Sequence, residues 1–371
     1  MRTLFTAVPV FGHLLPLLPI ARAARAAGDE VLVVADPLLG SAVGDLDLVP
    51  LAGSAPELFA ETTRRFGSDG TDVSDLTAMA GFFAVSRPAL SYKNLLATAR
   101  SYRPDVLVAD HYDLVAPLVA SATGARWVPV TISPPLSAAG VEALRSGLCG
   151  AFGEHGLQAV DSACRLDIWP RALVEPGTPA DPDTIPVRPG VHTGHAGAPL
   201  ALPERGPRAR VLVTFGTVVQ DAALLERIVV DLLDRGFSVV ATGAAELVDA
   251  HLGGPGARFL GVGFVPLDQL LPEVDVVVSA GGAGTVLACL VQGVPLVVMP
   301  VLADQPFIAA AVAAVGVGRT CATADEVAGA VEGVVDEPAA TTRAQEFAAR
   351  LAEVDDAAAV WPKVAAAVRG H

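Results

Sequence analysis

The chain has few cysteines, few aromatic residues and few basic residues. Its four cysteines, Cys149, Cys164, Cys289 and Cys321, form no Cys-x-x-Cys pair and have no zinc-type spacing with histidine. This pattern favours a reduced, cytoplasmic protein and gives no sign of a metal site or of a bound cofactor. Aromatic residues make up only 5% of the chain, although 52% of it is hydrophobic. Such a composition favours tightly packed α/β layers over an aromatic-rich sandwich.

Basic residues are outnumbered, with 25 Lys and Arg against 40 Asp and Glu, for a net charge of −15. An acidic chain without a basic run is expected to bind neither nucleic acid nor an anionic membrane surface. Two apolar segments imitate export or membrane signals. Pro9, Gly12 and Pro16 interrupt the N-terminal one, and residues 276–303 contain four glycines and two prolines. Neither segment is therefore predicted to be a signal peptide or a membrane span.

Each half of the chain opens on a strand, a glycine-containing turn and a helix. In the first half LFTAVPV leads to the turn at Gly12–His13, and in the second RVLVTF leads to Gly216–Thr217. We therefore expect an α/β protein of two doubly wound, Rossmann-like domains that face each other across a cleft. A stretch rich in Pro and Gly around 176–208 separates them.

The predicted boundaries are an N-terminal domain over 1–190, a linker over 191–208 and a C-terminal domain over 209–371. The Ala-rich tail is expected to be helical, with Trp361 as an anchor and a final helix able to cross back to the N-terminal domain. Residues 37–90 read as loops and helices that shape a pocket. The sequence leaves open whether the protein forms a homodimer.

The segment 275–305, DVVVSAGGAGTVLACLVQGVPLVVMPVLADQ, carries the strongest functional signal. Glycines 281, 282 and 284 lie between a strand and a helix, where backbone N–H groups and the helix dipole form a phosphate cradle. Asp304 and Gln305 follow the next strand, and a carboxylate beside an amide suits the paired hydroxyls of a sugar. The alternative is two buried strands joined by a helix without a ligand.

A second candidate site lies in the first half. His13 follows the first strand, and its imidazole suits general-base chemistry. Asp110 ends the strand DVLVAD, so it can orient that imidazole if both strand ends meet at one edge of the sheet. His111 is the fallback base. Alternatively, His13 and Asp110 only cap helices.

Together these motifs resemble family 1 glycosyltransferases of the GT-B fold, in particular the bacterial antibiotic-type enzymes that attach nucleotide-activated sugars to natural products. The opening GHLLPLLPIARAARAAGDEV is similar to the family's first motif. LVTFGT, GFVPLDQLLPEVDVVVSAGGAGT and GVPLVVMPVLADQ are similar to its donor-binding region. The resemblance covers both ends of the chain and most of the second half, but not residues 37–100 or 135–190.

The resemblance implies an inverting, metal-independent hexosyl transfer from a nucleoside-diphosphate sugar to a hydrophobic acceptor. His13 would be the base and Asp110 its partner, in an acceptor-binding N-terminal domain. The implied donor-binding residues of the C-terminal domain are Gly216, Thr217, Val265, Gly282, Ala283, Gly284, Thr285, Asp304 and Gln305. The expected acceptor-binding residues are Phe11, Phe59, Met79, Phe82, Phe83 and His111.

One position departs from the family pattern. The family usually has a histidine directly before the two glycines, where it touches the diphosphate, and this chain has Ala280. The lost hydrogen bond would cost about 1–3 kcal/mol of binding. The chain also lacks the longer tryptophan-containing donor box of plant enzymes, so a thymidine-diphosphate deoxysugar is favoured over uridine-diphosphate glucose by analogy.

Two other functions compete with this interpretation. Ala280 motivates a non-catalytic auxiliary protein that keeps the fold with a weakened diphosphate site. A two-domain epimerase or phosphorylase would need acid–base groups close to the sugar, and no residue marks them out. The sequence does not reveal the acceptor, the sugar or the choice between O- and C-transfer.

Overall fold

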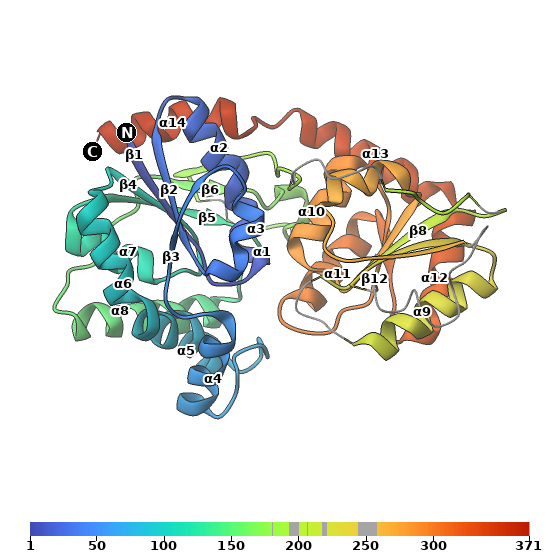
Figure 1. Cartoon of the computed structure of the whole chain (residues 1–371), viewed down its shortest axis with the longest axis horizontal. Coiled ribbons are helices and arrows are strands. Elements are labelled where there is room, and N and C mark those ends of the chain that lie inside the picture. The colour runs from blue at the N-terminus through green and yellow to red at the C-terminus, as the bar shows by residue number, and fades with distance from the viewer. Residues whose placement is uncertain (180, 193–199, 206, 217–220, 244–257, 371) are drawn as a thin grey trace. The chain divides into compact units, whose positions relative to one another are not determined.

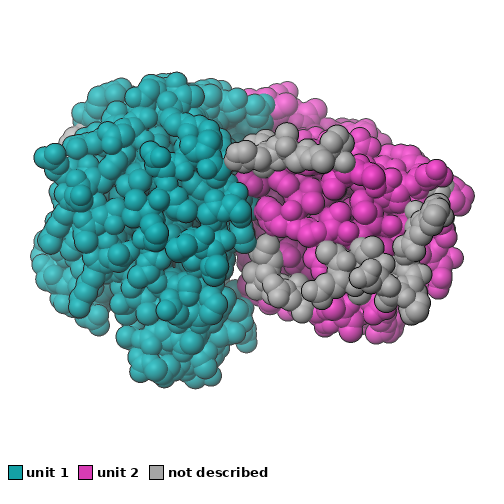
Figure 2. All heavy atoms as spheres, in the orientation of Figure 1, with its two compact units in different colours: residues 1–170, 176–188, 354–371 teal, residues 171–175, 189–353 magenta. Residues whose placement is uncertain are grey.

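The computed structural model describes the whole chain except residues 180, 193–199, 206, 217–220, 244–257 and 371 (Figure 1). The chain forms two compact units, shown in different colours in Figure 2. Unit 1 contains residues 1–170, 176–188 and 354–371, and unit 2 contains residues 171–175 and 189–353. The final segment of the chain therefore belongs to unit 1.

The described part of unit 1 contains a parallel sheet of seven strands in the order β3-β2-β1-β4-β5-β6-β7. Its central strands are runs of Val, Leu and Ala that are buried on both faces, as helices on both sides of a parallel sheet require. The strands are β1 (Arg2–Thr6), β2 (Glu30–Ala35), β3 (Asp47–Pro50), β4 (Val106–Asp110), β5 (Arg126–Thr131), β6 (Arg165–Asp167) and β7 (Thr184–Pro186).

Helices cover both faces of this sheet. Leu4 packs in a cluster with Leu95 of α6 (Arg87–Tyr102) and Val119 of α7 (Val115–Thr123). The ring of the next residue, Phe5, lies 6.2 Å from that of Trp361 in α14 (Ala357–Gly370). The helices are α1 (Phe11–Leu14), α2 (Leu18–Ala26), α3 (Gly40–Val43), α4 (Ala55–Phe66), α5 (Leu76–Gly81), α6 (Arg87–Tyr102), α7 (Val115–Thr123), α8 (Ala138–Glu154) and α14 (Ala357–Gly370). The short turns are η1 (Leu15–Leu17), η2 (Pro37–Leu39) and the π-helical η3 (Phe82–Ser86).

The described part of unit 2 contains a six-stranded parallel sheet in the order β10-β9-β8-β11-β12-β13. The strands are β8 (Arg210–Thr214), β9 (Ser238–Thr242), β10 (Phe259–Val262), β11 (Val276–Ser279), β12 (Leu296–Val298) and β13 (Gly318–Thr320). The helices are α9 (Ala222–Asp234), α10 (Ala283–Gln292), α11 (Gln305–Val315), α12 (Ala324–Asp336) and α13 (Pro338–Ala352), with short turns η4 (Arg171–Leu173), η6 (Leu267–Gln269) and η7 (Leu271–Glu273).

The α/β class, with two parallel sheets, is confirmed, and Trp361 is confirmed as an anchor. Trp361 is 1% exposed, and its indole N–H donates to Asp29 at 3.0 Å. The elements differ from the expected ones in the region 37–90, which contains the strand β3 besides loops and helices. No described helix is both long and apolar enough to cross a membrane.

Candidate active site

The carboxyl edge of the unit 1 sheet brings His13 and Asp110 together. Strands β1 and β4 are neighbours in register, with Phe5 beside Val108 and Thr6 beside Ala109. The chain leaving β1 therefore passes Asp110 before it turns into α1, which contains His13. The Nδ1 atom of His13 lies 2.8 Å from Oδ1 of Asp110.

Asp110 is completely buried, and backbone groups hold it in place. Its Oδ2 accepts from the N–H of Val8 at 3.0 Å, and its Oδ1 accepts from the N–H of Tyr112 at 3.0 Å. Burial opposes ionisation of this carboxyl, but the His13 ring and the Val8 N–H outweigh burial and lower its pKa below the ordinary value. Asp110 is therefore a fixed carboxylate aimed at the imidazole.

This contact settles which nitrogen of His13 carries the proton in the neutral ring. A carboxylate can only accept, so Nδ1 is the donor and Nε2 has the lone pair. The His13 side chain is 18% exposed, whereas Asp110 is not exposed at all. An imidazole oriented in this way can take a proton at Nε2, and the carboxylate then stabilises the cation that forms.

His111, the fallback base, lies in a different environment. Its Nδ1 is 3.3 Å from the carbonyl oxygen of Val130, and burial lowers its pKa to about 4 despite the nearby Asp110. A ring with so low a pKa is a much weaker base than an ordinary histidine. The geometry therefore favours His13 for proton abstraction.

Aromatic rings gather beside His13. The rings of Phe83 and Tyr112 stack at 4.6 Å, and their centroids lie 6.1 Å and 5.9 Å from that of His13. Phe82 continues the group, 4.9 Å from Phe83 and 5.3 Å from Phe59. The structure thus brings together three of the expected acceptor residues, and the ring of His111 lies 3.8 Å from that of Tyr112.

Of the other two expected acceptor residues, Met79 is a core residue of α5 at 2% exposure, and Phe11 is half-buried at the start of α1. Tyr112 was not predicted from the sequence, although its position two residues after Asp110 in the same loop is a usable signal.

A buried ion pair behind this group was also missed. Arg87, at the start of α6, is 1% exposed and donates from Nε to Oδ1 of Asp113 at 2.8 Å and from Nη2 to Oδ2 at 3.3 Å. Charged residues are rarely buried unless they are paired. The sequence signal was weak, because an arginine within FFAVSRPALSY reads as a solvated helix residue.

In unit 2 the glycine turn has the geometry of a helix-start cradle. Gly281 has φ +87°, and its N–H donates to Oγ of Ser279 at 3.0 Å. A Cβ at this glycine would lie 2.7 Å from Cγ1 of Val298, so the close approach requires glycine. Gly282 is the N-cap of α10, and the first N–H groups of that helix, from Ala283 to Thr285, have no partner within the helix by its geometry.

Other expected donor residues lie at the same edge of the unit 2 sheet or outside the described residues. Gly216 follows β8 with φ +73°, whereas Thr217 lies outside the described residues. A Cβ on Gly284 would meet no atom within 4 Å. Ala280 is 2% exposed and packs in the core of unit 2, and the half-buried Val265 follows β10.

Gln305 has a structural task that the sequence did not reveal. Its Oε1 accepts from the N–H groups of Val301 and Leu302 at 2.8 Å and 2.9 Å, which pins the loop before α11. Only its amide Nε2 remains for a hydroxyl. In the same loop Ala303 has φ +55°, a conformation that costs a non-glycine residue energy and often marks a functional site. The half-buried Asp304 follows directly as the N-cap of α11.

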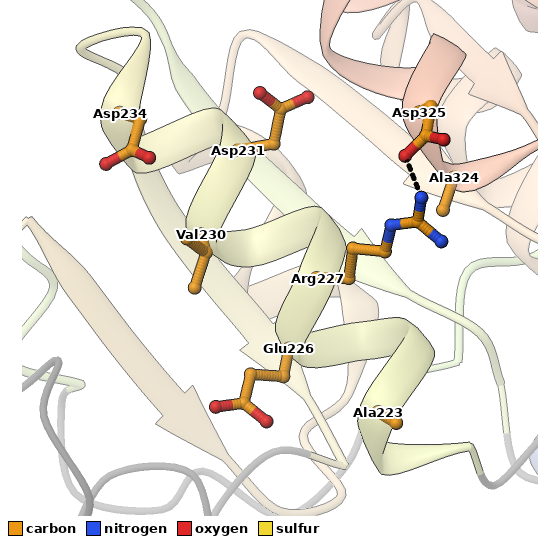
Figure 3. Close-up of a pocket in the computed structure, with 8 residues that line it drawn as sticks. All are labelled: Ala223, Glu226, Arg227, Val230, Asp231, Asp234, Ala324 and Asp325. Carbon is orange, nitrogen blue, oxygen red and sulfur yellow. Dashed lines mark hydrogen bonds and ion pairs between the residues drawn. The ribbon is translucent and has the colours of Figure 1, made fainter.

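A surface hollow of unit 2 lies elsewhere, along α9 and the start of α12 (Figure 3). It contains none of the expected site residues. Its charged lining consists of Glu226, Asp231, Asp234 and Asp325, together with Arg227, which is paired with Asp325 (Figure 3). An acidic lining repels phosphate, so this hollow is no candidate for the donor. Within the described chain no group of three or more His, Cys, Asp or Glu side chains is placed to hold a metal ion.

Comparisons with known proteins identify the family of the chain. Residues 239–366 match the family described as erythromycin biosynthesis protein CIII-like, C-terminal domain. The elloramycin glycosyltransferase of Streptomyces olivaceus is 32% identical, over 95% of this chain and 93% of its own length. The tylactone mycaminosyltransferase of Streptomyces fradiae is 30% identical, over 87% of this chain and 81% of its own length.

Among solved structures, the Streptomyces glycosyltransferase SsfS6 in complex with thymidine diphosphate superposes with a TM-score of 0.80. It is 25% identical, and the match covers 98% of this chain and 99% of that one. The relatives are matched over most of their length, so the likeness extends to both units. The chain belongs to the bacterial antibiotic-type natural-product glycosyltransferases, family 1 enzymes of the GT-B fold.

Proposed function

We propose that this glycosyltransferase transfers a deoxysugar from a thymidine-diphosphate donor to a hydroxyl of an apolar natural-product acceptor, with inversion at the anomeric carbon. The observation that carries the proposal is the 2.8 Å contact between Nδ1 of His13 and the buried carboxylate of Asp110. The aromatic rings of Phe83 and Tyr112 next to His13 suit an apolar acceptor.

In the proposed reaction, Nε2 of His13 takes the proton of the acceptor hydroxyl. The freed oxygen attacks the anomeric carbon from the side opposite the diphosphate, a C–O bond forms, and the bond to the leaving oxygen breaks. Asp110 stabilises the imidazolium that results. The attack from the opposite side gives inversion.

Thymidine diphosphate leaves with additional negative charge. The N–H groups at the start of α10, from Ala283 to Thr285, offer fixed dipoles that stabilise this charge without rearrangement. Gly216 and Thr217 are proposed to contact the same diphosphate, and the backbone of Val265 the nucleobase. Asp304 and the amide group of Gln305 are proposed to bind sugar hydroxyls.

The thymidine-diphosphate complex of SsfS6 supports the choice of nucleotide. The choice of a deoxysugar rests on the absence of the longer tryptophan-containing donor box of plant enzymes. Ala280 lowers the expected affinity, because alanine adds no hydrogen bond to phosphate where the family usually has a histidine.

A side-by-side calorimetric titration with thymidine diphosphate and uridine diphosphate tests the donor site. Selective binding of thymidine diphosphate is expected. Selective binding of uridine diphosphate would overturn the proposed donor. If neither nucleotide binds, the proposal fails and the non-catalytic auxiliary protein suggested by Ala280 takes its place, with a search for a partner chain as the next step.

Turnover measurements test whether His13 acts as the general base. We expect His13→Gln to bind thymidine diphosphate as the wild type does and to lose transfer to a hydroxyl acceptor, because glutamine is similar in length but cannot take up a proton. Full turnover by this variant would remove His13 from the mechanism.

A further inference from the structure

Behind the His13–Asp110 pair, a single buried guanidinium ties three segments of unit 1 together. The Arg87 side chain donates to Asp113, to the hydroxyl of Ser91 at 2.6 Å and to the carbonyl oxygen of Ala7 at 2.8 Å. The hydroxyl of Thr6 also donates to Asp113, at 3.0 Å. Arg87 is 1% exposed and the Asp113 side chain is not exposed, so water cannot replace these contacts.

Two of these contacts end next to the residues that hold the catalytic carboxylate. Ala7 directly precedes Val8, whose N–H donates to Oδ2 of Asp110. Asp113 lies on the other side, in the loop after β4, and its own N–H donates to the carbonyl oxygen of Asp110 at 3.0 Å. Arg87 therefore fixes both loops that enclose Asp110.

The third segment carries the aromatic rings. Arg87 directly follows the π-helical turn η3, which contains Phe82 and Phe83. A π-turn is a rare distortion that occurs often at functional sites. Phe83 stacks on Tyr112, which lies between Asp110 and Asp113 in sequence. The same cation thus sets the positions of the acceptor-side rings and of the carboxylate relative to each other.

The buried ion pair of Arg87 and Asp113 is better suited to fixing the positions of its neighbours than to stabilising the fold. Burying two charges costs much of what their attraction returns, and a well-packed apolar pair of similar size often serves stability equally well. A guanidinium, however, offers several donors in a fixed planar fork, which a lysine cannot reproduce. Here the fork spans Asp113, Ser91 and Ala7, a set that only a directional group can bridge.

We propose that Arg87 and Asp113 are positioning residues for the His13–Asp110 base. They hold this base in a fixed position relative to the aromatic rings of Phe83 and Tyr112. The proposal rests on the proposed function of His13. Neither residue contacts the reacting atoms, and both act through Asp110 and its two loops.

The test compares Arg87→Lys with Arg210→Lys, a matched control. Arg210 is a 7% exposed arginine of unit 2 whose guanidinium bonds the carbonyl oxygens of Pro203 and Glu273. The first measurement is proton NMR of histidine-labelled protein, which detects the downfield proton on Nδ1 of His13, assigned by its loss in His13→Gln. We expect the signal in the wild type and in Arg210→Lys, and its loss to solvent exchange in Arg87→Lys.

The second measurement is turnover with thymidine-diphosphate glucose and thymidine-diphosphate rhamnose as donors, and alizarin and tylactone as acceptor probes. We expect kcat of Arg87→Lys to fall about a hundredfold, the effect of a small misplacement of a catalytic group. The Kd for thymidine diphosphate should not change. If the wild type turns over neither probe, the NMR signal decides.

A double variant, Arg87→Met with Asp113→Leu, removes both buried charges and covers the case in which a single variant does not fold. Its NMR signal should be lost although the protein is folded. A folded Arg87→Lys or double variant that keeps the NMR signal overturns the positioning role, and so does one whose kcat stays within about threefold of the wild type when the wild type turns over a probe. When the wild type is active, an inactive His13→Gln leaves the proposed function standing, whereas an active His13→Gln overturns the proposed function on its own.

Discussion

Replacing Asp110 by asparagine tests the oriented base most directly. Both carboxylate oxygens accept in the native protein, from His13 and Tyr112 on one side and from Val8 on the other. An asparagine has one acceptor oxygen and one NH2 group. If its oxygen accepts from Val8, its NH2 group faces Nδ1 of His13 and the N–H of Tyr112. The imidazole must then accept at Nδ1 and carry its proton on Nε2, the wrong tautomer for a base.

The size of the effect follows from this change. General-base catalysis contributes about 10²–10⁴-fold to rate, and the Asp110→Asn enzyme should lose most of it. This corresponds to about 3–5 kcal/mol of transition-state stabilisation. The unfolding free energy should fall by about 1–3 kcal/mol, because the N–H of Tyr112 loses its acceptor in a buried site.

The assay is kcat and KM for the acceptor, with calorimetric Kd for thymidine diphosphate to check that the proposed donor site is intact. Asp36→Asn is the matched control, because Asp36, directly after β2, is 4% exposed and accepts from the N–H of Leu38. It should leave kcat unchanged. If Asp110→Asn keeps wild-type kcat, Asp110 serves only as a structural anchor and the orienting role is refuted.

Asp110 also links the stability of unit 1 to pH. Its native pKa lies below the ordinary value of 3.8, because the favourable contacts with His13 and Val8 exceed the cost of burial. The unfolded chain therefore takes up a proton first as the pH falls, and the stabilisation present above the unfolded pKa is lost toward the native one. The difference in urea-unfolding free energy between wild type and Asp110→Asn should be constant above about pH 5 and should shrink as the pH falls below that value. A constant difference would contradict the lowered pKa.

Three further predictions concern other parts of the chain. Gly281→Ala places a methyl group 2.7 Å from Val298 at φ +87°. The urea-unfolding free energy of unit 2 should therefore fall by more than about 1 kcal/mol, and thymidine diphosphate should bind more weakly. Unchanged binding would show that the turn can relax. Trp361→Phe removes the hydrogen bond to Asp29 and should cost about 1 kcal/mol of stability, and equal urea midpoints would contradict its anchoring role. Cys149 is exposed, whereas the other three cysteines are buried with pKa values raised by burial, so the native protein should react rapidly with one equivalent of a disulfide reagent and with the remainder only after unfolding.

The buried strands of the fold could be predicted from the sequence, because their residues are apolar on both faces of the sheet. Runs such as VLVVA and VVVS are buried on both sides of a parallel sheet, so they appear as uninterrupted apolar segments. The strand β3 was missed because Asp47–Pro50 is short, mixed in polarity and at the edge of the sheet. The π-turn η3 was missed because its extra residue depends on the packing of neighbouring helices rather than on local composition.

The contact between His13 and Asp110 could be predicted because strand ends of one parallel sheet meet at one edge. The roles of Arg87 and Gln305 could not. Arg87 lies in a sequence typical of an exposed helix start, and only the fold reveals that Asp113 is within reach. Gln305 was predicted as a sugar ligand, but its side-chain oxygen Oε1 accepts from the N–H groups of a loop that contains Ala303, whose φ is positive.

The return of the last helix to unit 1 has a consequence for biosynthesis. Strand β1 is among the first segments to leave the ribosome, yet α14, which covers Phe5 and packs along α2, is made after all of unit 2 (Figure 1). During translation the face of the sheet that receives Trp361 therefore stays uncovered while residues 189–353 are synthesised and fold. Unit 1 therefore gains α14 only after unit 2 has been synthesised. A nascent chain stalled before residue 354 would present a complete unit 2 attached to a unit 1 that lacks α14.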